Sequence, residues 1–243
     1  MVHDVHAHID LYYDRKRVIS YIERENINTI AMTNLPEIYK KYQEEHFFSK
    51  YIRFALGFHP ELVLQYYSQI DCFLKLLPDA KYIGEIGLDF SREKTLQDKN
   101  TQIKIFNEII KNCKQYTDKK ILNIHSRNAA IEVIEIINCY HGKIIMHWFS
   151  GKFSEINNVI KNGYFFSVNN QMVDSRHGRD LIGQIPINKL LIESDAPFTK
   201  MSKFNYNIES LNYVYKQIAT IKKLDYDIVK RQLDKNFYSL VDL

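Results

Sequence analysis

The sequence predicts an α/β protein of the (β/α)8 barrel class, the TIM barrel, built as a single domain over residues 1–243. Short apolar runs rich in β-branched residues alternate with longer segments in which apolar residues recur at helical spacing. Eight such repeats in about 240 residues match this barrel in number and in length. A doubly wound open sheet is the alternative, but it would more often carry a glycine-rich first turn, which the sequence lacks.

Each predicted strand is a short apolar run, and each predicted helix is an amphipathic segment that follows such a run. In chain order, the strands are expected at residues 2–8, 27–33, 51–57, 81–86, 120–124, 143–146, 164–168 and 189–192. The helices are expected at residues 14–25, 36–45, 61–77, 96–116, 129–139, 153–162, 176–185, 208–221 and 225–240. No low-complexity segment or Gly/Ser linker interrupts this alternation.

The composition is that of a globular protein, with 45% hydrophobic and 26% charged residues and a net charge of +4. No run of about 18 apolar residues is present, so no membrane association is expected. The chain reaches His3 and Asp4 without a basic region and an apolar stretch, which argues against a secretory signal. Cys72, Cys113 and Cys139 lack Cys-x-x-Cys spacing and are interpreted as reduced thiols of a cytoplasmic protein.

Side chains that can bind metals stand at the carboxyl ends of the predicted strands. Asp4, His6 and His8 share one face of the first strand, because side chains two residues apart in a strand point the same way. An isolated His-x-His pair is more often part of a core than a metal site. Later runs end at or near His59, Glu85, His125, His147 and Asp195. In a barrel these ends converge on one mouth, where active sites are built.

The types of ligand narrow the choice of metal. Four imidazoles with two carboxylates suit Zn²⁺, Mn²⁺, Fe²⁺ or Ni²⁺, and a partly aqueous site also suits Mg²⁺. Six ligands are more than one tetrahedral ion needs, so two divalent ions with a bridging carboxylate are expected. Two ions about 3.5–4 Å apart are a recurrent solution for phosphodiester hydrolysis. A mild positive charge is compatible with such a polyanionic substrate without requiring one.

Six motifs follow one another in register along the chain. They are Asp-Val-His-Ala-His at 4–8, Gly-Phe-His-Pro at 57–60, Gly-Glu-Ile-Gly-Leu-Asp at 84–89, Ile-His-Ser-Arg at 124–127, His-Trp-Phe-Ser-Gly at 147–151 and Glu-Ser-Asp-Ala-Pro at 193–197. Together they resemble the TatD family of metal-dependent deoxyribonucleases, which belongs to the amidohydrolase-like barrels. The resemblance continues to Lys-Asn-Phe at 235–237 and so covers nearly the whole chain.

The resemblance implies a site with two divalent metal ions, with Zn, Mg or Mn as candidates. His6, His8 and Asp195 would hold one ion. His125 and His147 would hold the other, and Glu85 would bridge the two. Glu85 or Asp195 would orient a metal-bound water or take its proton.

The same resemblance implies supporting roles for four further residues. His59 would contact the substrate phosphate near the metals. Arg127, expected one turn into the helix after His125, would also bind phosphate, and an ordinary surface arginine is the alternative. Asp4 and Glu193 would support the metal ligands from behind.

Family members are typically 3′-to-5′ exonucleases on DNA, and some act on RNA, so DNA with single strands or 3′ ends is the expected partner. After residue 197 the family's Arg-Gly and Asn-x-Pro landmarks give way to Phe-Thr-Lys-Met-Ser-Lys-Phe-Asn-Tyr-Asn at 198–207. This compact form resembles QatD, the TatD-like nuclease of Qat anti-phage operons, and implies the other Qat operon proteins as partners. The alternatives are a hydrolase of a small amide, ester or lactone, and a non-catalytic subunit of a defence complex.

Two groups of side chains near these motifs have open interpretations. The aromatic residues Phe90, Trp148, Phe149 and Phe198 either stack on a terminal base or pack within the barrel. The basic residues either surround the mouth of the barrel and attract nucleic acid or are ordinary solvent-exposed charges. These residues are Arg92, Lys94, Lys152, Arg176, Arg179, Lys200 and Lys203.

Overall fold

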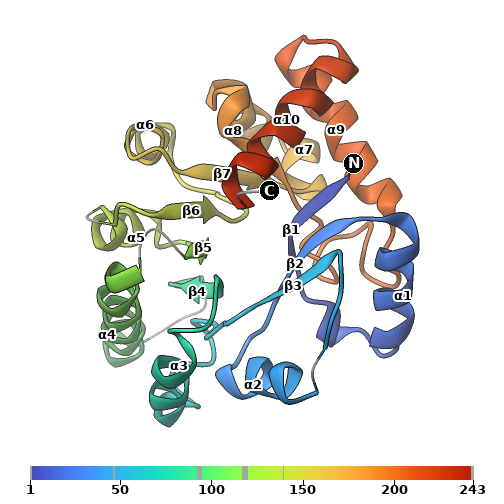
Figure 1. The fold of residues 1–243 in the computed structure, drawn as a ribbon. Helices are drawn as coiled ribbons and strands as arrows, with labels where there is room; N and C mark the ends of the chain where they lie inside the picture. The colour runs from blue at the N-terminus through green and yellow to red at the C-terminus, as the bar shows by residue number, and fades with distance from the viewer. Residues whose placement is uncertain (1, 46, 92–94, 117–119, 139, 242–243) are drawn as a thin grey trace. The chain divides into compact units, whose positions relative to one another are not determined.

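The computed structural model describes residues 2–45, 47–91, 95–116, 120–138 and 140–241 (Figure 1). Cys139, Arg92 and Lys94 lie outside the described residues. The strands alternate with helices in the predicted order, and they are β1 His3–Ala7, β2 Asn28–Met32, β3 Ile52–Ala55, β4 Tyr82–Gly87, β5 Ile121–His125, β6 Lys143–Met146, β7 Phe165–Val168 and β8 Leu190–Ile192. Every strand pair within the described residues whose register is resolved is parallel, as an α/β protein requires.

The helices also follow the predicted order. They are α1 Arg15–Glu25, α2 Pro36–Glu44, α3 Ile70–Leu76, α4 Leu96–Cys113, α5 Ala130–Ile137, α6 Phe153–Lys161, α7 Asn170–Asp174, α8 Arg176–Gln184, α9 Ile208–Lys222 and α10 Tyr226–Val241. Short 3-10 turns stand at Ile9–Leu11, Tyr67–Gln69, Lys114–Tyr116 and Ile187–Lys189. Among the described helices, none combines the length and the apolar character that crossing a membrane needs.

The helix expected at residues 61–77 was wrong in its first half, because α3 begins only at Ile70. The chain first turns around His59. The backbone N–H of Glu61 donates to His59 Nδ1 over 3.2 Å, and the N–H of Leu62 donates to the His59 carbonyl over 2.9 Å. These local bonds satisfy backbone donors that a helix would otherwise use.

Helix α7 was not predicted at all, since five residues are too few to show a helical period. Its start is nevertheless marked in the sequence by Asn169. The side-chain oxygen of Asn169 accepts hydrogen bonds from the backbone N–H groups of Gln171 and Met172, each over 3.1 Å. Asparagine is among the preferred residues at this position, because its oxygen satisfies donors that have no partner within the helix.

One compact unit comprises residues 1–31, 49–53 and 165–243. Within it β1 pairs with β2, and β7 pairs with β8. A bridge between Ala7 and Ala196 ties the end of β1 to the segment that follows β8. Helix α10 packs on β8, and α7, α8 and α9 contact one another. The ends of β1 and β8 are therefore held side by side in this unit.

A second compact unit comprises residues 32–48 and 54–164. Its strands β4, β5 and β6 pair in that order, with Ile86 opposite Ile124 and Ile124 opposite Met146. Helices α2 to α6 contact one another in succession, and Figure 1 shows them following each other along the outside of these strands. The apolar side chains of the strands are buried beneath these helices.

Two of the three strands that contain predicted ligands, β1 and β4, are irregular at the ligand. The pairing of β1 with β2 changes register between Asp4 and Ala7, the stretch that contains His6. The pairing of β4 with β5 changes register between Ile83 and Ile86, the stretch that contains Glu85. Such irregularities are common beside active sites, where they re-aim a side chain.

Candidate metal centre

Three predicted ligands come together at the ends of β1 and β8, and we refer to His6, His8 and Asp195 as the β1–β8 cluster. The Nε2 atoms of His6 and His8 are 3.1 Å apart. Asp195 Oδ1 lies 3.7 Å from Nε2 of His6 and 3.9 Å from Nε2 of His8. All three side chains are buried. Three potential ligand atoms thus face a common point.

These separations fit a bound metal ion. Ligands about 2.1 Å from one tetrahedral ion lie about 3.4 Å from each other. The three observed separations, 3.1, 3.7 and 3.9 Å, lie on either side of that value. Two imidazoles and one carboxylate are also a donor set that divalent transition metals favour. The β1–β8 cluster is therefore suited to hold a divalent cation.

Asp4 supports this cluster through the backbone. Its Oδ1 accepts hydrogen bonds from the N–H of Ser194 over 2.9 Å and from the N–H of His6 over 3.2 Å. Its Oδ2 accepts one from the Tyr206 hydroxyl over 2.8 Å. Burial raises the pKa of Asp4 to about 6, although these hydrogen bonds lower it in part. The carboxylate thus joins the strand that carries the histidines to the segment that carries Asp195.

The backbone of Asp195 has a φ of 45°, a left-handed conformation that residues other than glycine rarely adopt. Its N–H donates to the His6 carbonyl over 2.9 Å, and its own carbonyl accepts from the N–H of Phe198 over 2.8 Å. Left-handed residues of this kind cost free energy and cluster at functional sites. The local bonds show how the fold keeps the carboxylate beside His6 and His8.

The second unit brings together four more of the predicted residues, and we refer to His59, Glu85, His125 and His147 as the Glu85 cluster. Glu85 Oε1 lies 2.5 Å from Nδ1 of His125 and 3.7 Å from Nε2 of His147. Glu85 Oε2 lies 3.6 Å from Nε2 of His59. Glu85 and His147 are buried, and His125 and His59 are partly exposed. One carboxylate therefore stands at the centre of three imidazoles.

Gly87 gives the Glu85 cluster its close backbone packing. Its φ is +139°, and a Cβ built on it would lie 2.0 Å from the carbonyl oxygen of His125. A residue without a side chain is thus required where β4 passes the end of β5. This requirement explains why glycine stands two residues after Glu85.

Asp89 contacts the Glu85 cluster through His125 but was not among the predicted site residues. Its Oδ2 lies 2.9 Å from Nε2 of His125, and its Oδ1 accepts from the N–H of Ser91 over 2.8 Å. Burial alone would lower the pKa of His125, but Glu85 and Asp89 outweigh it and raise that pKa to about 9. Burial alone would raise the pKa of Asp89, but hydrogen bonds from His125 and Ser91 outweigh it and hold that pKa well below its usual range. The only sequence signal for Asp89 is its place in the 84–89 motif.

His59 differs from the other imidazoles in its hydrogen bonding. Because its Nδ1 accepts from the N–H of Glu61 over 3.2 Å, the neutral ring carries its proton on Nε2. That Nε2 faces Glu85 Oε2. A protonated nitrogen donates a hydrogen bond and does not bind a metal. This arrangement suits the predicted contact with a phosphate oxygen, which stays a prediction.

Glu193 and Arg127 occupy different surroundings. The carboxylate of Glu193 is buried and accepts hydrogen bonds from Asn169 Nδ2, over 3.0 Å, and from the Ser167 hydroxyl. It thereby ties the end of β8 to the end of β7. Arg127 is exposed in the turn before α5. The expectation that it lies one turn into a helix was wrong, because α5 begins only at Ala130. Its phosphate contact stays a prediction.

The aromatic residues near the motifs divide into two groups. Phe149 is only 1% exposed, so its ring packs in the core and cannot stack on a base. Trp148 is half-buried and lies edge-on to His147, with ring centroids 6.3 Å apart. Phe198 is 57% exposed, and its ring is nearly perpendicular to that of His8, with centroids 5.2 Å apart.

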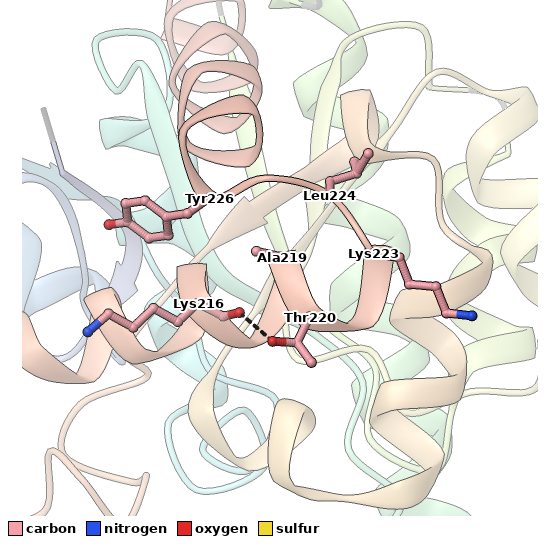
Figure 2. A pocket seen from close by; sticks show the side chains of 6 residues that line it. All are labelled: Lys216, Ala219, Thr220, Lys223, Leu224 and Tyr226. Atoms are coloured by element: carbon pink, nitrogen blue, oxygen red, sulfur yellow. Dashed lines mark hydrogen bonds between the residues drawn. The ribbon is translucent and has the colours of Figure 1, made fainter.

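A separate hollow of about 470 Å³ lies at the turn between α9 and α10 (Figure 2). It is lined by Lys216, Ala219, Thr220, Lys223, Leu224 and Tyr226. Figure 2 shows the two lysine side chains extending away from each other. Since the lining includes no imidazole and no carboxylate, this hollow is not a metal site.

The family of the chain follows from comparison with known proteins. The family model described as TatD related DNase matches residues 3–242. The chain belongs to the TatD family. Both clusters described above therefore lie in a TatD chain, and the predicted family is confirmed. This match does not distinguish the QatD subgroup within the family.

Individual relatives agree with this assignment. The uncharacterized metal-dependent hydrolase YabD of Bacillus subtilis is 26% identical over 245 residues, 93% of this chain and 93% of that protein. The 3′-5′ ssDNA/RNA exonuclease TatD of Citrobacter koseri is 30% identical over 156 residues, 58% of this chain and 56% of that protein. The chain spans 59% and 64% of the length of the first curated relatives that it matches.

Comparison with solved structures confirms the fold class. The TatD homologue YjjV of Escherichia coli K12 matches with a TM-score of 0.86 and 20% identity, over 100% of this chain and 98% of that one. At this identity the likeness shows the fold alone. Together with the parallel pairing and the alternation of strands and helices, it gives the α/β fold of a (β/α)8 barrel, as predicted.

Proposed function

We propose that this TatD chain is a divalent-metal-dependent nuclease that hydrolyses DNA phosphodiester bonds from 3′ ends, acting as one domain over residues 1–243. The observation that carries the proposal is the β1–β8 cluster, whose three ligand atoms have the mutual separations of ligands around one ion. The family assignment supports hydrolysis of DNA. The C. koseri relative, named as a 3′-5′ exonuclease on ssDNA and RNA, supports the direction and the single-stranded substrate.

We propose two divalent ions, with Zn²⁺, Mg²⁺ or Mn²⁺ as candidates. His6, His8 and Asp195 would hold one, and His125, His147 and Glu85 would hold the other. When bound, such ions lower the pKa of a coordinated water and neutralise charge on a phosphate. The bridging role of Glu85 stays a prediction from the family resemblance.

The chain's own residues would bind and orient the substrate. The Nε2–H of His59 is a donor for a phosphate oxygen, and the exposed guanidinium of Arg127 supplies positive charge. The carboxylates of Glu85 and Asp195 would orient the attacking water or accept its proton. Asp4 and Glu193 would keep the ends of β1, β7 and β8 in place.

A finer proposal concerns biological role. The segment 198–207 departs from the family's landmarks, and the compact form of the chain resembles QatD. On this resemblance we propose a role in anti-phage defence beside the other Qat operon proteins, in the cytoplasm. Plaque counts on cells that carry the whole operon test it. An Asp195→Ala operon is expected to lose protection, and protection equal to the wild-type operon would contradict the role.

The direct test is cleavage of 5′- and 3′-labelled single- and double-stranded DNA under a panel of metals. Wild-type protein is expected to shorten 5′-labelled single strands from the 3′ end. Glu85→Ala and Asp195→Ala, if folded, are expected to be inactive, because each removes a carboxylate from its cluster. The matched control is Glu135→Ala, which removes an exposed carboxylate on α5. Activity near wild type in either cluster variant would refute the assigned roles. Turnover of small esters or amides without cleavage of DNA would favour the alternative hydrolase.

A further inference from the structure

The segment 198–207, which follows Asp195 and departs from the family's landmarks, is held by buried polar side chains. The Thr199 hydroxyl donates to the Ser194 carbonyl over 2.7 Å and accepts from Asn170 Nδ2 over 3.2 Å. The Ser202 hydroxyl lies 3.3 Å from that of Ser210. Both side chains are fully buried. Each anchor ties the segment to the body of its unit.

Two tyrosines add further anchors in the same unit. Tyr206 is buried and its hydroxyl donates to Asp4 Oδ2 over 2.8 Å. The hydroxyl of Tyr12 donates to the carbonyl of Ser202. Because buried polar groups must keep their partners, these bonds fix the path of the segment. Its exposed side chains are consequently presented from a fixed backbone.

Five exposed side chains of the segment are either apolar or basic. Phe198, Met201 and Phe204 are 57%, 38% and 80% exposed. Lys200 and Lys203 are also exposed, and the ammonium of Lys203 lies 5.5 Å from the centroid of the Phe204 ring. The segment 198–207 contains no acidic residue. Several exposed apolar side chains on one fixed segment point to an interaction surface. We call these five side chains the 198–204 platform.

The platform adjoins the β1–β8 cluster through Phe198. The rings of Phe198 and His8 are nearly perpendicular, with centroids 5.2 Å apart, and the N–H of Phe198 donates to the Asp195 carbonyl over 2.8 Å. A ligand seated on the exposed face of Phe198 would therefore lie beside two candidate metal ligands.

Aromatic rings interleaved with lysines suit a polynucleotide, in which flat bases alternate with negatively charged phosphates. Bases stack on aromatic faces without regard to sequence, and lysines neutralise the phosphates. In a duplex the bases are already stacked on one another, so this surface fits unpaired nucleotides. A protein partner could pack on the apolar side chains, but an apolar protein surface does not require the two positive charges of the lysines.

We propose that the 198–204 platform binds unpaired nucleotides of the substrate strand, with Phe198 stacking on a base next to the scissile phosphate. This inference rests on the proposed nuclease function and names the part of the chain that selects single strands. Lys200 and Lys203 contact the phosphates that follow.

The experiment compares two oligonucleotides of equal length, a 5′-labelled oligo-dT and the same oligomer with abasic terminal nucleotides. Phe198→Ala is expected to raise the KM for oligo-dT about tenfold, since one stacked base contributes about that much. The effect is expected to vanish on the abasic oligomer, which has no base to stack. Lys200→Ala/Lys203→Ala is expected to flatten the salt dependence of KM, by about 0.7 in log–log slope for each phosphate that a lysine no longer neutralises.

Two matched controls are available on the same chain. Phe48→Ala removes a phenylalanine that is 94% exposed in the other unit. Lys216→Ala/Lys223→Ala removes two exposed lysines around the hollow of Figure 2. The platform precedes the first residue of α9, whereas Lys216 and Lys223 lie about 12 Å and about 22 Å beyond that residue along the helix. Neither control is expected to change KM or its salt dependence.

The outcomes separate this inference from the proposed function. Equal KM values for wild type and Phe198→Ala on oligo-dT, or an equal loss on both oligomers, would overturn the platform and leave the nuclease activity standing. If the wild type cleaves neither oligomer, fluorescence anisotropy of labelled oligo-dT decides. About tenfold weaker binding by Phe198→Ala would support the platform without the nuclease, and unchanged binding would overturn both.

Discussion

The Nε2 atoms of His6 and His8 face each other across 3.1 Å in a buried setting. Two imidazoles can share only one hydrogen between these nitrogens, whereas a cation can accept a lone pair from each. The carboxylate of Asp195 stands within 4 Å of both nitrogens and supplies negative charge. The three side chains are therefore already positioned to bind a divalent ion.

Metal binding is expected to stabilise the fold. An ion present at a hundred times its dissociation constant adds about 2.7 kcal/mol to the free energy of unfolding. For a chain of this length that corresponds to a rise in Tm of about 5–10 °C. Thermal unfolding of EDTA-treated protein, with and without added Zn²⁺ or Mn²⁺, measures it. His6→Ala/His8→Ala should show a smaller shift, and a shift as large as wild type would contradict binding at the β1–β8 cluster.

Asp89 is expected to affect activity although it was not predicted as a site residue. It holds the ring of His125 from the side opposite Glu85, and loss of such a partner typically costs about 10–100-fold in metal affinity or activity. Asp89→Asn is therefore expected to lower kcat/KM on DNA by that factor while the protein stays folded. Glu135→Gln, an exposed carboxylate on α5, is the matched control. Equal kcat/KM for Asp89→Asn and the control would refute the positioning role.

Asp4 is expected to be important for stability. Replacing it with alanine leaves two buried N–H groups and one hydroxyl without their acceptor, and each such loss costs about 1–3 kcal/mol. Asp4→Ala is therefore expected to lower the free energy of unfolding by at least about 3 kcal/mol, measured by urea denaturation in EDTA. Tyr206→Phe removes one of these bonds and should cost about 1 kcal/mol. Equal losses in the two variants would contradict this account.

His3 is expected to make stability depend on pH. It is buried on Phe237 and contacts the Tyr215 hydroxyl, and burial lowers its pKa although Asp234, 3.7 Å away, opposes this. A group with a lower pKa in the folded chain stabilises the fold above its unfolded pKa, about 6.5, and loses that contribution as the pH falls. Stability should therefore decrease below about pH 6.5, by up to about 1.4 kcal/mol per pH unit from this group.

The measurement is the free energy of unfolding of wild type and His3→Gln across pH 4.5–7.5, since glutamine keeps hydrogen-bonding capacity without titrating in this range. The difference between the two proteins should shrink as the pH falls. A difference that is constant with pH would show that His3 does not titrate on unfolding.

The sequence was informative wherever a strand ends. His6, His8, Glu85, His125, His147 and Asp195 were recognisable because a buried apolar run stops at each of them, and the fold brings them into two clusters. The alternation of runs and amphipathic segments likewise gave every strand in the right place. These features depend on local pattern and on the rule that parallel strands present their carboxyl ends together.

Features set by tertiary contact were not recoverable in this way. Asp89 lies beyond the end of β4 and reaches His125 only because Gly87 lets the two strands approach. Phe149 and Phe198 look alike in sequence, yet one is buried and the other is exposed. The start of α3 was misplaced because backbone donors bond to His59. In each case the deciding partner is not visible in the local pattern.

The bound metal content tests most directly the proposal that each cluster holds one divalent ion. Protein loaded with Mn²⁺ or Zn²⁺ and dialysed to remove free metal is analysed by plasma mass spectrometry. Wild type is expected to retain about two ions per chain, and His6→Ala/His8→Ala about one. Equal metal content in wild type and the double variant, or no retained metal in wild type, would contradict the account.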